Sequence, residues 1–408
     1  MIPLIAWRNI WRSRTRSLVV IGAIAIGVWA ALFMTGFATG MARGYVRSAV
    51  DNIVSHLQMH HPQFKEDYDA RFMVETPGAV ADRLRDMPSI KAVSARAVVN
   101  GMASTPKGAR GVQIKGIDPE QEAGVTTLRE KIVEGSYFLP DRRNEVLISV
   151  AMADKLHIKM RSKLVLTFQE TSGELTTGAF RVAGIFDSGN KPFDETHIFV
   201  DHSDMAALLA PGSPAEDVIQ EIAIMLHEPK TAAAVSDTLQ SLFPGLLSET
   251  YHQISPDLEM YESQINTVSY IYLGIIMLAL VFGIVNTMLM AVLERYREIG
   301  MLMAIGMNKI KVFSMIVFEA LMLGLIAAPL GMGLGWVSML YLGRKGINLS
   351  AYSESLRLYG LEQIIYFELP PETYWQAGIF VMITALLASL YPAWKAISLR
   401  PVEAIRKI

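Results

Sequence analysis

The chain has 408 residues, of which 51% are hydrophobic and 19% are charged, and its formal net charge is −2 at pH 7. This composition is too apolar for an average soluble protein and too charged for a pure membrane bundle, so it predicts a few membrane spans joined to a sizeable water-exposed domain. The near-zero net charge gives no indication of nucleic-acid binding, and the absence of cysteine excludes disulfides, thiolate metal sites and cysteine nucleophiles.

The first 42 residues combine a basic segment with an uncharged run. Residues 1–16 carry four arginines among tryptophan and isoleucine side chains, a pattern typical of a short amphipathic helix on the cytoplasmic membrane face. The same pattern is also typical of the basic flank of a first span. Residues 17–42 contain no charge and exceed the ~20 residues that cross hydrocarbon, whereas a signal peptide has an apolar core of ~7–15 residues. We therefore expect a retained span at 17–42.

Residues 43–264 are mixed and polar, with no run long enough to span a membrane. Short apolar runs between turn residues predict strands, and helical patterns lie between them, so we expect an α+β domain. The predicted strands are 112–114, 145–149, 163–168, 180–185, 197–200 and 221–226. A weak internal repeat gives two helices the same apolar spacing, at Val80, Leu84 and Met87 and at Val235, Leu239 and Leu242. We infer two related strand–helix–strand units that flank a strand-rich insert at about 105–215.

Three further apolar stretches predict spans. The spans are 265–293, 312–343 and 373–394; a charged loop at 294–311 and an outer segment at 344–372 join them, and a tail at 395–408 follows. Lysine and arginine gather in the N-terminal flank, in the loop and in the tail, so the positive-inside rule places these three in the cytoplasm and residues 43–264 outside. We expect four transmembrane α-helices with a large extracytoplasmic α+β domain between the first and second spans. In a Gram-negative cell this domain is periplasmic and the membrane is the inner membrane.

The loop at 294–311 has a polar head and a short apolar piece between two glycines, Gly300 and Gly306. This pattern predicts a short helix at the membrane surface that passes a push from a soluble partner into the spans. On charge pattern alone, an ordinary positive-inside loop is equally compatible.

Three motifs, in this order along the chain, resemble those of the FtsX/MacB/LolC-LolE permease family. They are Ala6-Trp7-Arg8-Asn9-Ile10-Trp11-Arg12, then Arg297-Glu298-Ile299-Gly300 with Ala304-Ile305-Gly306, and finally Tyr391-Pro392-Ala393 with Arg400-Pro401-Val402-Glu403-Ala404-Ile405-Arg406. Met303 departs from the pattern, since many relatives carry arginine there. The resemblance implies a MacB-like periplasmic core domain. It also implies a loop that docks on an ATPase through Glu294, Arg295, Arg297, Glu298, Ile299, Gly300, Ala304, Ile305 and Gly306, supported by Pro401, Val402 and Arg406 in the tail.

The resemblance further implies the membrane subunit of a mechanotransmission-type ABC transporter. Two permease subunits, identical or paralogous, would bind two separate ATPase subunits, which would hold ATP and Mg²⁺. This chain has no G-x-x-x-x-G-K-[ST] loop, so we expect no enzyme activity and no cofactor on it. The expected cargo is lipoprotein taken from the outer leaflet of the inner membrane and passed to a periplasmic chaperone. The alternatives are a MacB-like efflux permease for peptides, toxins or antibiotics, and an FtsX-like signalling subunit that controls cell-wall hydrolases.

Two sets of intramembrane residues are candidates for function. Glu319 is ionisable and lies inside a predicted span, and we favour a structural tie to the coupling loop or the tail over a proton relay. A path for cargo between the first and second spans would be lined by aromatic and methionine side chains, whose alternative role is to face lipid or pack. These candidates are Phe33, Phe37, Tyr270, Tyr272 and Met277.

Three histidines close together in the sequence could suggest a metal site: His56, His60 and His61. Their segment has strand character, which sends neighbouring side chains to opposite faces. We therefore expect solvated strand residues and no metal site.

Overall fold

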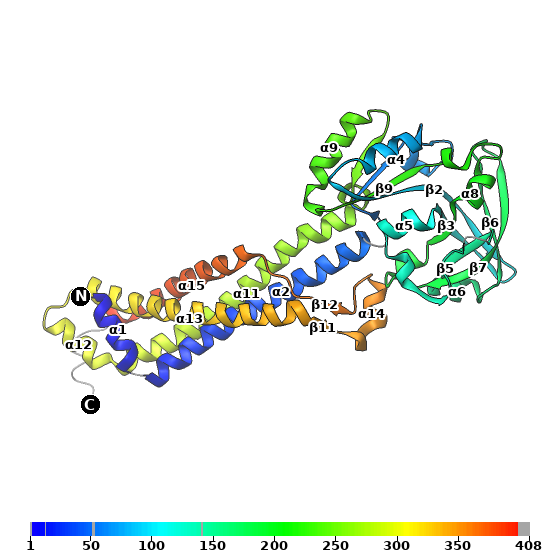
Figure 1. The fold of residues 1–408 in the computed structure, drawn as a ribbon. Coiled ribbons are helices and arrows are strands. Elements are labelled where there is room, and N and C mark those ends of the chain that lie inside the picture. Colours follow the sequence, from blue (N-terminus) through cyan, green and yellow to red (C-terminus); the bar gives the residue numbers. More distant parts are fainter. Residues whose placement is uncertain (1, 13, 51–53, 140–141, 399–408) are drawn as a thin grey trace. The chain divides into compact units, whose positions relative to one another are not determined.

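The computed structural model describes residues 2–12, 14–50, 54–139 and 142–398, with the backbone alone at residues 2–4, 256–257, 261–262 and 265–266. Contacts divide the chain into two compact units (Figure 1). The helical unit comprises Met1–Ala42, Ser263–Asn348 and Ile364–Ile408, and the sheet unit comprises Arg43–Glu262 and Leu349–Gln363.

Four helices are long and apolar enough to cross a membrane. They are α2 (Arg14–Ala49), α11 (Pro256–Glu294), α13 (Lys309–Lys345) and α15 (Pro371–Ile397). The 36 residues of α2 span on the order of 54 Å, whereas hydrocarbon is ~30 Å thick, so this helix continues beyond the apolar layer. A shorter helix, α1 (Ile2–Arg12), precedes them, with Ala6 and Ile10 buried and Trp7 and Trp11 exposed.

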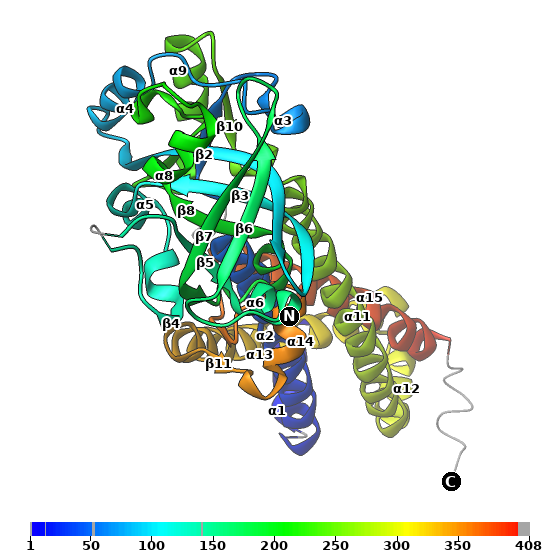
Figure 2. The same cartoon turned by 90° about the vertical axis from the view of Figure 1, so that its right-hand side faces the viewer.

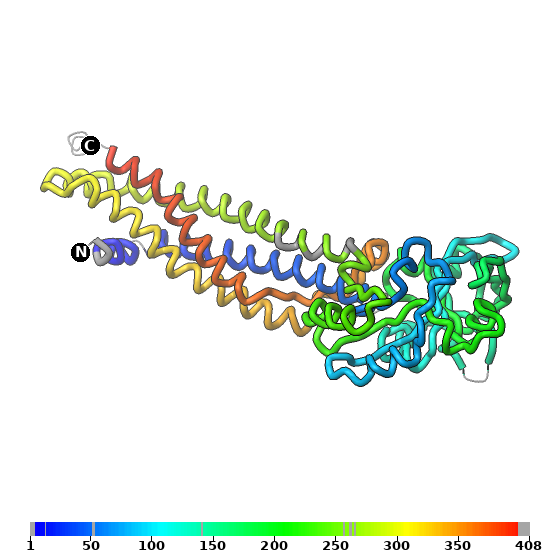
Figure 3. Tube along the Cα trace, turned by 90° about the horizontal axis from the view of Figure 1, so that it is seen from above, coloured from blue at the N-terminus to red at the C-terminus, as the bar shows by residue number. Residues whose placement is uncertain are grey.

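Glycines let α13 approach the backbone of α2 in the helical unit (Figure 3). A Cβ atom at Gly331 would lie 2.6 Å from the carbonyl oxygen of Ala25, and one at Gly335 would lie 2.7 Å from a methyl group of Leu32. Close approach of helices through small residues is common in membranes, where packing replaces the hydrophobic effect. The tryptophan ring nitrogen of Trp29 on α2 also donates to Ser338 Oγ on α13 at 2.9 Å.

The sheet unit contains a ten-stranded sheet (Figure 2). Its strands are β1 (Leu57–His60), β2 (Ile90–Thr105), β3 (Gly108–Ile117), β4 (Ile132–Gly135), β5 (Glu145–Ser149), β6 (Lys163–Gln169), β7 (Leu175–Phe186), β8 (His197–Asp201), β9 (Glu221–Leu226) and β10 (Leu247–Thr250). The order is β10-β1-β9-β2-β3-β8-β5-β7-β4, and β6 pairs with both β2 and β7. The path β2-β3-β8-β5-β7-β6 therefore closes into a six-stranded barrel. Its buried side chains form one apolar core that includes Ile114, Ile148, Phe168, Phe180 and Ile198.

Strands β10, β1 and β9 extend this sheet beyond the barrel and carry two helices, α4 (Pro77–Arg85) and α9 (Ala232–Leu242). Val80 and Leu84 of α4 and Val235 and Leu239 of α9 are buried in a shared core, which gives the two strand–helix–strand units a common packing. Leu242 differs from the spacing of the repeat and is 46% exposed. Leu242 is the last residue of the helix and lies outside the shared core.

The remaining short helices connect strands or cap them. They are α3 (Phe64–Asp67), α5 (Pro119–Val125), α6 (Val150–Leu156), α7 (Lys191–Asp194), α8 (His202–Leu209), α10 (Tyr251–Ile254) and α14 (Ser353–Leu358). Between α13 and α15, strands β11 (Ile347–Asn348) and β12 (Ile364–Ile365) pair. Residues 349–363 between these two strands belong to the sheet unit, where Arg357 of α14 forms an ion pair with Asp187 after β7.

Candidate functional site

The loop between α11 and α13 folds into a separate helix, α12 (Tyr296–Ala304). Its buried face carries Ile299, which is 3% exposed, and Gly300. Gly306 has a φ of +102°, a region that side chains rarely adopt, so glycine permits the turn after the helix. Asn308 then caps α13, because its side chain accepts a hydrogen bond of 3.1 Å from the Ile310 amide. The turn therefore fixes where α12 ends and the next span begins.

The junction is the region where the end of α11, helix α12 and the start of α13 meet. Two ion pairs connect it to the N-terminal helices of the chain. Arg12 of α1 donates two hydrogen bonds to Glu298, at 3.1 Å and 2.6 Å, in the bidentate geometry that is strongest for this pair. Arg16 of α2 contacts Glu294 at 2.6 Å. The resemblance predicts that both carboxylates face an ATPase, whereas in the structure both form ion pairs with arginines of the same chain. The sequence signal was the matching spacing, since the two arginines and the two glutamates are each four residues apart.

A third ion pair lies inside the junction. Arg295 Nη1 lies 3.4 Å from both carboxylate oxygens of Glu319 on α13, and Arg295 Nη2 donates to the carbonyl oxygen of Asn9 at 3.2 Å. The Glu319 side chain is only 7% exposed. A charged side chain in a span is costly unless it is paired, so Arg295 compensates Glu319. This contact favours the structural tie over the proton relay.

Part of the loop is exposed. Met301, Ile305 and Ile310 are 54%, 81% and 71% exposed, and Arg297 and Lys309 are exposed beside them. Ala304 and Gly306 are exposed as well. The surface that remains for a partner is therefore an apolar projection with flanking cations.

A cavity of about 300 Å³ lies between α12 and the helices around it. Its walls come from α1, α11, α12 and α13 and include Asn9, Met288, Arg295, Met301, Met315 and Glu319. The exposed residues Met301 and Ile305 also line this cavity, so it opens to the surface, and the ion pairs border it.

The residues expected to support the loop from the tail, Pro401, Val402 and Arg406, lie outside the described residues. The five candidate cargo-lining residues do not form one surface. Rings of Phe33 and Phe37 pack against Phe367, with centroids 5.0 and 5.5 Å apart. Met277 is buried in the core of the helical unit, while Tyr270 and Tyr272 of α11 are exposed.

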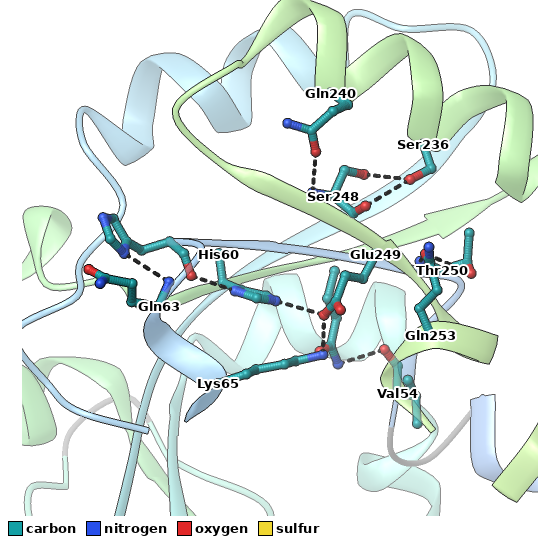
Figure 4. A network of polar contacts seen from close by, with 12 residues as sticks. Val54, His60, Gln63, Lys65, Ser236, Gln240, Ser248, Glu249, Thr250 and Gln253 are labelled. Atoms are coloured by element: carbon teal, nitrogen blue, oxygen red, sulfur yellow. Dashed lines mark hydrogen bonds and ion pairs between the residues drawn. The ribbon is translucent and has the colours of Figure 1, made fainter. Parts of the chain in front are cut away.

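The expectation that the three histidines are solvated is wrong for His56 and His60, which are buried. Strand β1 lies between β9 and β10 in the sheet, and all its side chains are covered. His60 Nε2 contacts Glu249 at 2.9 Å, and Lys65 contacts the same carboxylate at 2.5 Å (Figure 4). These two bonds hold the pKa of Glu249 at about 2. Among the described residues, no three acidic or histidine side chains are grouped to hold a metal ion.

A buried charge cluster in the sheet unit escaped the sequence reasoning. Arg96 on β2 contacts Glu122 and Glu221 at 2.7 Å each, and Lys115 on β3 is buried nearby. Burial would raise the pKa of Glu221, but Lys115 and Arg96 hold it at about 2. The two positive and two negative charges balance, and they join β2, β3, β9 and α5. We assign this cluster to the specification of the fold, because buried ions remain only where they are paired.

Comparison with known proteins adds family evidence to this geometry. Residues 17–242 match the MacB-like periplasmic core domain, and residues 270–401 match the FtsX-like permease C-terminal domain. The chain is 23% identical over 350 residues to the lipoprotein-releasing system transmembrane protein LolE of Haemophilus influenzae, covering 79% of each chain. It is 23% identical over 309 residues to the LolC protein of Xylella fastidiosa, covering 72% of each. It is also 27% identical over 291 residues to the pyoverdine export ATP-binding/permease protein PvdT of Pseudomonas fluorescens, covering 67% of this chain and 40% of that protein.

The match to the periplasmic core domain spans more than half of the 408 residues, and it covers the first span and strands β1 to β9 of the sheet. The permease match covers the third and fourth spans and most of the second. The predicted class of fold is thereby confirmed. The chain belongs to the FtsX/MacB/LolC-LolE family of ABC transporter permeases, with four transmembrane helices and a periplasmic α+β domain between the first and second.

Proposed function

We propose that this chain is the permease subunit of a mechanotransmission-type transporter that extracts lipoproteins from the outer leaflet of the bacterial inner membrane. The cargo is passed to a periplasmic lipoprotein chaperone, and a separate ATPase supplies the energy. The observation that carries the proposal is the pair of relatives named as lipoprotein-releasing transmembrane proteins, which align over most of both chains. Two permease subunits, identical or paralogous, and two ATPase subunits complete the complex.

The charges near the span ends support the orientation. Arg8, Arg12, Arg14 and Arg16 lie before the uncharged run of α2, arginine and lysine lie at both ends of α12, and Lys395 lies in the last turn of α15. The positive-inside rule places these ends, both termini and α12 in the cytoplasm. The sheet unit then lies in the periplasm, where lipoprotein cargo is handed over.

The exposed side of α12 supports the docking of an ATPase. Met301, Ile305 and Ile310 form an apolar projection at a level where water, and not lipid, is the solvent in this orientation. Apolar anchors that fill a partner's pocket carry most of the energy of a protein interface. Arg297 and Lys309 add cations at its rim. ATP and Mg²⁺ are held by the partner.

The test uses the tagged chain, purified in mild detergent from its own cells, with mass identification of bound proteins and lipids. We expect an ATPase and triacylated lipoprotein. Ile305→Asp places a charge in the docking pocket and should reduce recovered ATPase at least about ten-fold, since one charged group in an apolar pocket costs at least ~1.4 kcal/mol. Thr238→Asp, on an exposed face of α9 in the sheet unit, is the matched control, and the same amount of ATPase should be recovered with it as with the unaltered chain. Recovery of ATPase without any acylated protein would remove the lipoprotein assignment.

The relation to a pyoverdine export ATP-binding/permease protein favours one second candidate, export of a small molecule or peptide from the periplasm. The same purification separates the two proposals. Recovery of an ATPase together with a periplasmic adaptor and an outer-membrane channel would favour export.

A further inference from the structure

The four N-terminal arginines fall into two classes. Arg12 and Arg16 form ion pairs with Glu298 and Glu294. Arg8 and Arg14 are exposed, and within the described part of the chain neither forms an ion pair. A basic flank that serves only to contact lipid headgroups would use all four arginines alike. The structure therefore gives two of them an additional task.

The two ion pairs join different helices, and the order of the residues is reversed: the earlier arginine contacts the later glutamate. Arg12 ends α1 and Arg16 lies in the first turn of α2, while Glu294 ends α11 and Glu298 lies in the first turn of α12. Neither α1 nor α2 is joined to α12 through a short loop. The Arg12–Glu298 pair therefore connects α1 with α12, and the Arg16–Glu294 pair connects the first-span helix α2 with the end of α11, directly before α12.

Packing alone gives α12 an incomplete support. The cavity of about 300 Å³ lies between α12 and its neighbours, and Arg12, Arg295, Glu298 and Glu319 all contribute to its walls. Because this cavity opens to the surface at Met301 and Ile305, α12 contacts its neighbours along only part of its length. Exposed ion pairs are individually weak, but a bidentate arginine and several pairs acting together are the exception. The buried Ile299 and these polar contacts together hold α12 in place.

We propose that Arg12, Arg16 and Glu319 are positioning residues that make α1, α2 and α13 follow α12 when a partner moves it. Arg12 links α1 to Glu298 of α12, Arg16 links the start of the first span to Glu294 at the end of α11, and Glu319 links the third span to Arg295, which precedes α12. This inference rests on the proposed function, because it requires an ATPase that displaces α12. It adds that the charges of Glu294 and Glu298 act within the chain, while the apolar projection contacts the partner.

The test is a charge exchange in the complex of the full chain with its ATPase, reconstituted in liposomes with triacylated lipoprotein. Arg16→Glu and Glu294→Arg should each lower the lipoprotein released per ATP hydrolysed about five-fold or more, the lower end of measured coupling between sites. Recovery of the ATPase should not change. The double variant Arg16→Glu/Glu294→Arg should regain at least half of the release. Arg14→Glu, two residues away, should leave release unchanged.

Equal losses in Arg14→Glu and Arg16→Glu, without recovery in the double variant, would overturn the inference in favour of a lipid-binding flank. A second measurement does not depend on transport. Because the chain has no cysteine, Arg12→Cys/Glu298→Cys should be joined within the chain by a short thiol cross-linker, and neither single cysteine variant should be. If no ATPase is recovered with the unaltered chain, the proposed function fails. If the ATPase is recovered but neither the exchange nor the cross-link behaves as expected, the positioning role fails alone.

Discussion

Asp194, the last residue of α7, is a buried carboxyl group in the sheet unit. Burial raises its pKa from near 4 to about 7, although Ser188 Oγ donates a hydrogen bond of 2.6 Å to it. The folded protein therefore holds this proton more tightly than the unfolded chain does. The stability that the group contributes is fully present below about pH 4 and is lost as the pH rises through about 7.

We expect Asp194→Asn to flatten the pH dependence of stability, because the amide cannot ionise. The thermal midpoint of the purified chain should fall less between pH 4 and pH 7 in the variant than in the unaltered chain. Asp82→Asn, on an exposed side chain of α4, serves as the control and should keep the original slope. An unchanged slope in Asp194→Asn would show that another group titrates.

At the scale of elements, the helical unit depends on how closely α13 approaches α2. The glycines of α13 do not all serve this contact. A Cβ atom at Gly331 would meet Ala25 and Val28 of α2, whereas one at Gly333 would meet nothing within 4 Å. The span contains Gly324, Gly331, Gly333 and Gly335, and the helix phase decides which of them face α2.

Gly331→Ala should therefore destabilise the helical unit by about 1–3 kcal/mol, the usual cost of overpacking. Gly333→Ala should leave stability equal or slightly higher, since alanine is the better helix former. The thermal midpoint of both variants in the same detergent provides the comparison. Equal midpoints would mean that α13 stands further from α2 than the structure places it.

In the sheet unit, too, strands that are far apart in the sequence pair with one another. Strand β2 extends through the internal repeat and the barrel, and it pairs with β9, β3 and β6. The insert expected at about 105–215 is consequently not a separate sheet. The strands β3 and β6 of this insert pair with the second half of β2, and β2 itself begins at Ile90, before the insert.

At the scale of the whole molecule, the proposed orientation in the membrane rests on the positive-inside rule, and labelling from either side tests it. The cysteine-free chain allows single labels. Ser172→Cys, in the turn after β6, should react with a membrane-impermeant maleimide in cells with a permeabilised outer membrane. Lys309→Cys, at the start of α13, should react only after the inner membrane is solubilised. The reverse pattern would invert the topology and remove α12 from the side of the ATPase.

The sequence by itself determined the four spans, the domain between the first two and the charged loop at 294–311. Each of these depends on local signals, namely uncharged runs longer than a bilayer and lysine and arginine at their ends. Only the tertiary structure decided the partners of Glu294 and Glu298, the burial of His56 and His60, and the closure of the barrel. These depend on contacts between residues far apart in the chain, as between Arg12 and Glu298, which are 286 positions apart. Local pattern carries no information about such pairs, because chain folding alone brings them together.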